Sequence, residues 1–198
     1  MKIFNIFKHN NDDLKFDFFK KHGLEKWWQS EFTADEREYI KSESSMLLDS
    51  RYNFDKSPAE ILYLLAGYVN TKNTKGHQYL AQLLLEKAVQ LADDPLILFI
   101  IYSQLIKLYF EHRNDAEEIR FKVIELCKKQ INLSEEVLNL LKKNELSEKI
   151  TEFEHEGYQK LALLNIEDGE SEKAEELLTK AKAEGWTGNW DKLELKLT

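Results

Sequence analysis

Cys127 is the only cysteine in the chain and the one residue whose type alone supplies a strong nucleophile. It lies inside an apolar helical pattern, and the sequence places no histidine near it. A cysteine nucleophile needs a neighbouring base or a lowered thiol pKa, whereas free cysteines are among the most deeply buried residues. We therefore interpret Cys127 as a buried structural thiol, and a single cysteine excludes an internal disulfide.

The histidines and carboxylates do not show the spacing of a reactive site. No H-x-x-x-H pair occurs among His9, His22, His77, His112 and His155. Glu154, His155 and Glu156 are adjacent, but neighbours in sequence point to different sides of a helix. The pairs Glu152/Glu156 and Glu172/Glu176 are typical of solvated helix faces. Because a metal site needs several converging ligands, we predict no metal, no cofactor and no catalytic residue.

Phosphate-binding and hydrolase motifs are also missing from the sequence. The segment 71–76 lacks the glycine spacing of a phosphate-binding loop, and no G-x-S-x-G occurs. We therefore expect the protein not to be an enzyme. A hidden enzyme centred on residues 154–156 stays the least favoured alternative.

Acidic residues are concentrated in the last third of the chain. The net charge is −8, and residues 133–198 contain nine Lys and Arg against sixteen Asp and Glu. An acidic surface repels phosphate backbones and attracts basic surfaces. We therefore predict a basic protein or peptide partner and no nucleic acid.

Composition favours long helices joined by short connections. The 198 residues include only seven Gly and two Pro, too few for the many turns of an all-β chain. No apolar run approaches 18 residues, so we predict no membrane span, and the apolar run at the N-terminus is too short for a signal peptide. We expect a cytoplasmic protein. The cluster Phe4, Ile6 and Phe7 either docks on the core or forms a weak membrane-surface anchor.

Two capping boxes mark helix starts, Thr33-Ala-Asp-Glu36 and Ser57-Pro58-Ala-Glu60. Asp94-Pro95 and Asn114-Asp115 are further start signals, and Gly185 has the position of a left-handed helix cap that Trp186 follows. The pattern of apolar residues predicts helices at 14–22, 24–46 with a restart at Thr33, 58–69, 75–92, 96–112, 116–131, 133–143, 147–166 and 171–184, and a short final helix.

Six large and small apolar residues recur on the last two long helices, namely Tyr158, Leu161, Ala162, Ala174, Leu178 and Ala181. This pattern resembles the tetratricopeptide (TPR) repeat, in which small residues let two helices approach while large ones fill the gap. A looser unit at 58–92 has Ala81, Leu85 and Ala88. A degenerate unit at 96–131 has Ile124 and Cys127, with Arg120 where the family has Ala.

The resemblance implies an all-α fold, a short TPR-like array of helical hairpins (an α-solenoid) over 58–198 after an N-terminal helical segment at 1–57. The whole chain also resembles uncharacterised bacterial TPR-containing proteins through Leu24-Glu-Lys-Trp27-Trp28 and Gly185-Trp186-x-Gly188-x-Trp190. That second resemblance implies no activity.

Such arrays imply a non-enzymatic protein–protein interaction module, with a concave surface formed by the first helices at 58–69, 96–112 and 147–166. The candidate partner-binding residues are Glu152, His155, Glu156, Gln159, Lys160 and Trp28. Trp28 is included because two adjacent tryptophans can hardly face one core. The alternative is an acidic inhibitor of the immunity or antitoxin kind, which would block a basic partner by charge complementarity.

Overall fold

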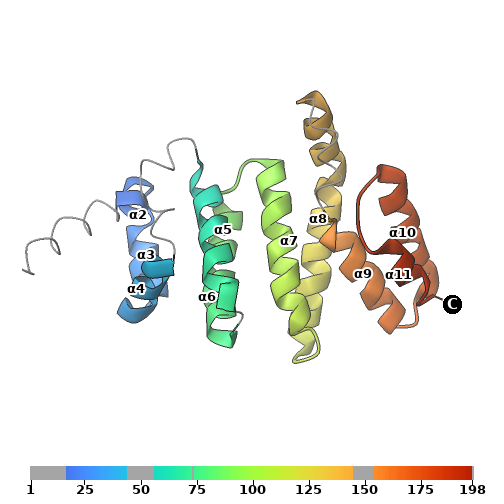
Figure 1. Cartoon of the computed structure of the whole chain (residues 1–198), viewed down its shortest axis with the longest axis horizontal. Helices are drawn as coiled ribbons and strands as arrows, with labels where there is room; N and C mark the ends of the chain where they lie inside the picture. Colours follow the sequence, from blue (N-terminus) through green and yellow to red (C-terminus); the bar gives the residue numbers. More distant parts are fainter. Residues whose placement is uncertain (1–16, 44–55, 73, 145–153, 198) are drawn as a thin grey trace, which may run out of the picture. The chain divides into compact units, whose positions relative to one another are not determined.

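The protein is described by a computed structural model, which covers residues 17–43, 56–72, 74–144 and 154–197 (Figure 1). Apart from one isolated bridge between Glu154 and Thr187, these residues form helices, turns and bends, so the all-α class is confirmed. No helix in these ranges is both long and apolar enough to cross a bilayer. The chain divides into two compact units, Met1–Ala92 and Asp93–Thr198. A domain boundary between residues 57 and 58 stays a prediction.

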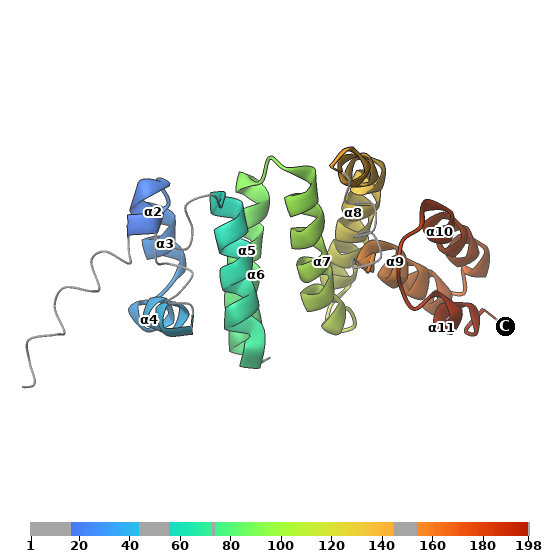
Figure 2. The same cartoon turned by 45° about the horizontal axis from the view of Figure 1, so that its top comes forward.

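The described residues of the first unit form three short helices followed by a helical hairpin. The elements are α2 (Asp17–Lys21), α3 (Glu25–Glu31), α4 (Ala34–Glu43), α5 (Pro58–Val69), the 3-10 turn η1 (Asn70–Lys72) and α6 (Lys75–Leu91). Helices α5 and α6 lie side by side in both views (Figures 1 and 2). Ala81, Leu85 and Ala88 are buried on α6, as the repeat pattern predicts.

Both predicted capping boxes are present in the first unit. The Glu36 N–H donates to the Thr33 hydroxyl, and the Thr33 N–H donates to the Glu36 carboxylate at 2.7 Å. Ser57 and Glu60 exchange the same two bonds at the start of α5. Each box satisfies backbone donors that have no partner inside a helix.

The predicted ends of the first helices, at 14–16 and 44–46, and the cluster Phe4, Ile6 and Phe7 lie outside the described residues.

In the second unit, the part of the chain that the structure describes forms two hairpins and a short closing helix. Its elements are α7 (Pro95–Glu111), α8 (Glu117–Lys143), α9 (Glu156–Glu167), α10 (Ser171–Glu184) and α11 (Trp190–Glu194). Helix α9 packs against both α7 and α8, and α10 packs against α9 (Figure 1). Helix α11 contacts α9 and α10. The second hairpin is therefore attached to the first mainly through α9.

Helix α8 is continuous where the sequence predicts two helices, at 116–131 and 133–143. Ser134, at the start of the predicted second helix, lies inside α8 and bonds the side chain of His155. The predicted cap at Asn114-Asp115 is also wrong. Asp115 bonds the His112 ring, and the N-cap of α8 is Ala116, which makes no side-chain bond.

Helix α9 begins at Glu156, later than the prediction of a helix over 147–166. Glu154 pairs with Thr187 in the isolated bridge, and the His155 N–H donates to the Thr187 carbonyl at 3.1 Å. At Glu154 and His155 the backbone therefore pairs with the C-terminal segment and does not continue the helix. The predicted start at Leu146-Ser147 lies outside the described residues.

The six repeat positions in α9 and α10 are all buried. All of them except Leu161 belong to a core that also contains Phe99 of α7, residues of α8, and Trp186, Trp190 and Leu193. Gly185 has a φ of 85°, and the Trp186 N–H bonds the Ala181 carbonyl at 3.1 Å, which is the predicted left-handed cap. Trp186 then stacks on Phe99 with ring centroids 5.0 Å apart.

Gly157 marks the closest approach of α9 to α8. A Cβ atom there would lie 2.9 Å from the Cys127 carbonyl oxygen and 2.9 Å from Gln130 Oε1. The carbonyl belongs to the backbone of a helix, so it cannot move aside as a flexible side chain would. Only glycine fits at this position without separating the two helices.

We predict that Gly157→Ala lowers the free energy of unfolding by about 1–3 kcal/mol, the usual cost of overpacking a closed core. The matched control is Gly67→Ala in α5, where a Cβ would meet no atom within 4 Å. Because alanine favours the helix over glycine, the control should stabilise the protein by up to about 1 kcal/mol. Urea unfolding of both variants measures this. Equal effects at the two sites would contradict the close approach.

Candidate functional site

The structure places most of the predicted partner-binding residues inside the protein. His155, Glu156 and Gln159 are at most 5% exposed, and Trp28 is 3% exposed. Lys160 keeps 28% of its side chain exposed. Glu152 lies outside the described residues. The expectation that these side chains are available to a ligand is therefore wrong for His155, Glu156, Gln159 and Trp28, and each burial has a physical reason.

Trp28 belongs to the aromatic core of the first unit. Its ring stacks on Phe19 with centroids 4.1 Å apart and contacts Phe32 at 4.8 Å. Its neighbour Trp27 is half-buried and lies 5.7 Å from the Lys87 ammonium group. The two tryptophans do face different surroundings, as predicted, but Trp28 is the core residue and not the contact residue.

Four residues, Gln130, Ser134, His155 and Gly157, form a buried cluster that we call the polar junction. The Gln130 side-chain amide donates to the Phe99 carbonyl at 3.0 Å and to the Ser103 hydroxyl, both on α7. Its oxygen accepts the Gly157 N–H at 2.6 Å. One glutamine on α8 therefore ties α7 to the first turn of α9.

His155 connects the polar junction to the C-terminal segment. Its Nδ1 accepts the Tyr158 N–H at 3.3 Å, which caps α9, and its Nε2 lies 2.9 Å from the Ser134 hydroxyl. The ring also packs edge-on against Phe99 and Trp186. Burial lowers the pKa of His155 from 6.5 to about 3, so the imidazole is neutral at ordinary pH.

The Ser134–His155 pair has the residue types of a hydrolase but not the required protonation. A base that activates serine must accept the hydroxyl proton on a ring nitrogen that carries none. Here Nδ1 already accepts a backbone N–H, so the single proton of the neutral ring is on Nε2, which donates to Ser134. Both side chains are buried, and the bond holds the helices together.

Cys127 is buried, as predicted for a structural thiol. Burial, with a further contribution from the charge of Glu156, raises the pKa of its thiol to about 12. The reactive thiolate is therefore almost absent at neutral pH. Its carbonyl is the group that Gly157 approaches.

Glu156 and Gln159 are also engaged with neighbouring elements. The Glu156 carboxylate lies 3.2 Å from the Lys107 ammonium group of α7 and 3.5 Å from that of Lys160. Gln159 Oε1 accepts the Asn189 N–H at 3.0 Å. Two lysines thus neutralise Glu156, one of the two carboxylates that we expected to attract a basic partner.

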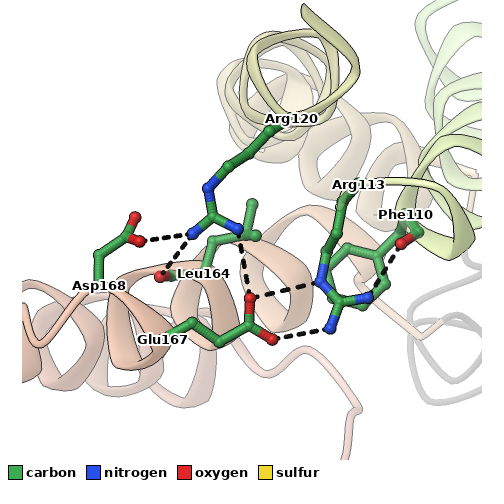
Figure 3. A network of polar contacts seen from close by, with 6 residues as sticks. All are labelled: Phe110, Arg113, Arg120, Leu164, Glu167 and Asp168. Atoms are coloured by element: carbon green, nitrogen blue, oxygen red, sulfur yellow. Dashed lines mark hydrogen bonds and ion pairs between the residues drawn. The ribbon is translucent and has the colours of Figure 1, made fainter. Parts of the chain in front are cut away.

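A network of ion pairs joins the α7–α8 turn to the end of α9 (Figure 3). Arg113 approaches both oxygens of Glu167, at 2.8 and 3.3 Å. Arg120 bonds Asp168 at 2.6 Å, Glu167 at 3.3 Å and the Leu164 carbonyl at 3.4 Å. The hydrogen bond from Arg113 lowers the pKa of Glu167, and the one to Asp168 raises the pKa of Arg120.

The network accounts for an arginine at position 120, where the tetratricopeptide pattern predicts an alanine. The Arg120 side chain extends from α8 to the C-terminal end of α9, where it bonds Glu167, Asp168 and the Leu164 carbonyl (Figure 3). Sequence alone could not find it, because its partners lie 47 and 48 residues away.

Three carboxylates on α10 remain exposed, those of Glu172, Glu175 and Glu176. Their spacing of three and four residues places them on one face of the helix. The three lysines of α10 are already paired, Lys173 with Glu170, Lys180 with Glu184 and Lys182 with Glu194. Among the described residues no ion pair involves the three carboxylates, which we call the acidic face. In the sequence, the spacing of Glu172 and Glu176 indicates only a solvated helix face.

Comparison with protein-family models, with curated proteins and with solved structures finds no match to this chain. Within the described residues, no three histidine, cysteine or carboxylate side chains gather where they could hold a metal ion.

The low pKa of His155 predicts that acid destabilises the protein through this residue. In the unfolded chain His155 takes up a proton near pH 6.5, but in the fold only near pH 3. Its contribution to stability is therefore complete above pH 6.5 and is lost as the pH falls toward 3, by up to about 1.4 kcal/mol per pH unit.

The measurement compares urea unfolding of the wild type and His155→Gln between pH 7 and pH 4. The difference in free energy should shrink as the pH falls. If the variant does not fold, NMR titration of the wild-type imidazole gives the pKa directly. Protonation of His155 near pH 6.5 would contradict its burial.

For the ion-pair network, we predict a salt-dependent coupling between Arg120 and Asp168. Exposed pairs contribute about 0.2–1 kcal/mol, and the two-arginine network should place this one near the upper limit. A double-mutant cycle with Arg120→Gln and Asp168→Asn measures the coupling at 20 mM and 500 mM NaCl. The control is the Glu125–Lys129 pair within α8, expected near 0.3–0.5 kcal/mol. A coupling below that of the control would contradict the network.

Proposed function

We propose that the protein is a cytoplasmic, non-enzymatic interaction module built from TPR-like hairpins, and that its partner is a basic protein or peptide. What supports a scaffold is the buried set of repeat positions in α9 and α10 and the packing of α9 on the preceding hairpin. A binding role without catalysis is supported by the burial of the residues whose types could be reactive. Cys127, Ser134 and His155 are each buried, and the Ser134–His155 bond joins α8 to the start of α9.

The single observation that carries the choice of partner is the acidic face. Residues 93–198 contain 15 Lys and Arg against 23 Asp and Glu, which accounts for the whole net charge of −8. The Glu156 region, which the sequence favours as the binding site, is neutralised by Lys107 and Lys160. The acidic face of α10 is not neutralised, so it attracts a basic surface. We therefore place the contact there.

The alternative is an inhibitor of the immunity or antitoxin kind, which the same acidic face supports. Charge complementarity speeds association with a basic protein and selects against acidic ones. An inhibitor would form a tight one-to-one complex that abolishes the activity of its partner. A scaffold would leave that activity intact.

The experiment is affinity capture from the native host with the wild type and with Glu172→Lys/Glu175→Lys/Glu176→Lys as bait, followed by mass spectrometry. We expect a basic protein on the wild type and at least a tenfold loss of binding to the variant. Size-exclusion chromatography with light scattering then gives the stoichiometry, and an activity assay of the captured partner separates scaffold from inhibitor.

The matched control is Glu118→Lys/Glu135→Lys/Glu136→Lys, which makes the same change of net charge at exposed positions of α8. It should retain most of the binding. Equal loss in both variants would show that only overall charge matters. Acidic or nucleic-acid partners would contradict the proposal.

A further inference from the structure

We draw no further inference here: the strongest candidate, the outward face of α5 formed by Tyr63, Leu64, Gly67 and Tyr68, carries nothing because nothing in the described structure shows what covers it.

Discussion

The second unit depends on the close approach of α9 to α8 at Gly157. The backbone there comes so near the Cys127 carbonyl that only a hydrogen atom fits on the α-carbon. At that distance the Gly157 N–H reaches Gln130, which also holds α7 through Phe99 and Ser103. Three helices thus meet through one glycine and one buried glutamine. A larger residue at either place would change how the second hairpin sits on the first.

Other features of this unit follow from that contact. With α9 fixed at its first turn, His155 reaches Ser134 and its backbone reaches Thr187. Thr187 follows Trp186, which fills the space beside Phe99. At the far end of α9, Arg113 and Arg120 hold the turn after the helix. Ser134 and His155 therefore serve to hold α8 and α9 together, and removing one partner would leave the other buried and unsatisfied, which is costly.

Local signals in the sequence predict the elements well. The capping boxes at Thr33 and Ser57 and the glycine cap at Gly185 each involve residues at most five apart, so their chemistry is complete within a short window. The bulky and small positions of α9 and α10 are also buried as predicted, because helical spacing places them on one face of each helix. The errors arise where a residue has a distant partner. Ser134 bonds His155 instead of starting a helix, and Glu154 pairs with Thr187 instead of extending one.

The candidate site was harder to predict, because burial depends on which helices meet. His155, Glu156 and Gln159 are polar, and a single amphipathic helix would expose them. In the structure three elements converge on this first turn of α9, from α7, from α8 and from the segment around Asn189. The acidic face of α10 was visible in sequence as carboxylates at helical spacing. Its significance came from the structure, which shows that the lysines of α10 are occupied elsewhere.

Hydrogen exchange at the Gly157 amide shows whether the polar junction fixes the second hairpin. Amides in the first turn of a helix have no partner within the helix and usually exchange fast. The reference is Glu172, at the same position in α10, whose N-cap makes no side-chain bond. We expect the Gly157 amide to exchange only when the second unit unfolds, whereas the Glu172 amide exchanges near the rate of an unstructured chain. Fast exchange of Gly157, equal to that of Glu172, would contradict it.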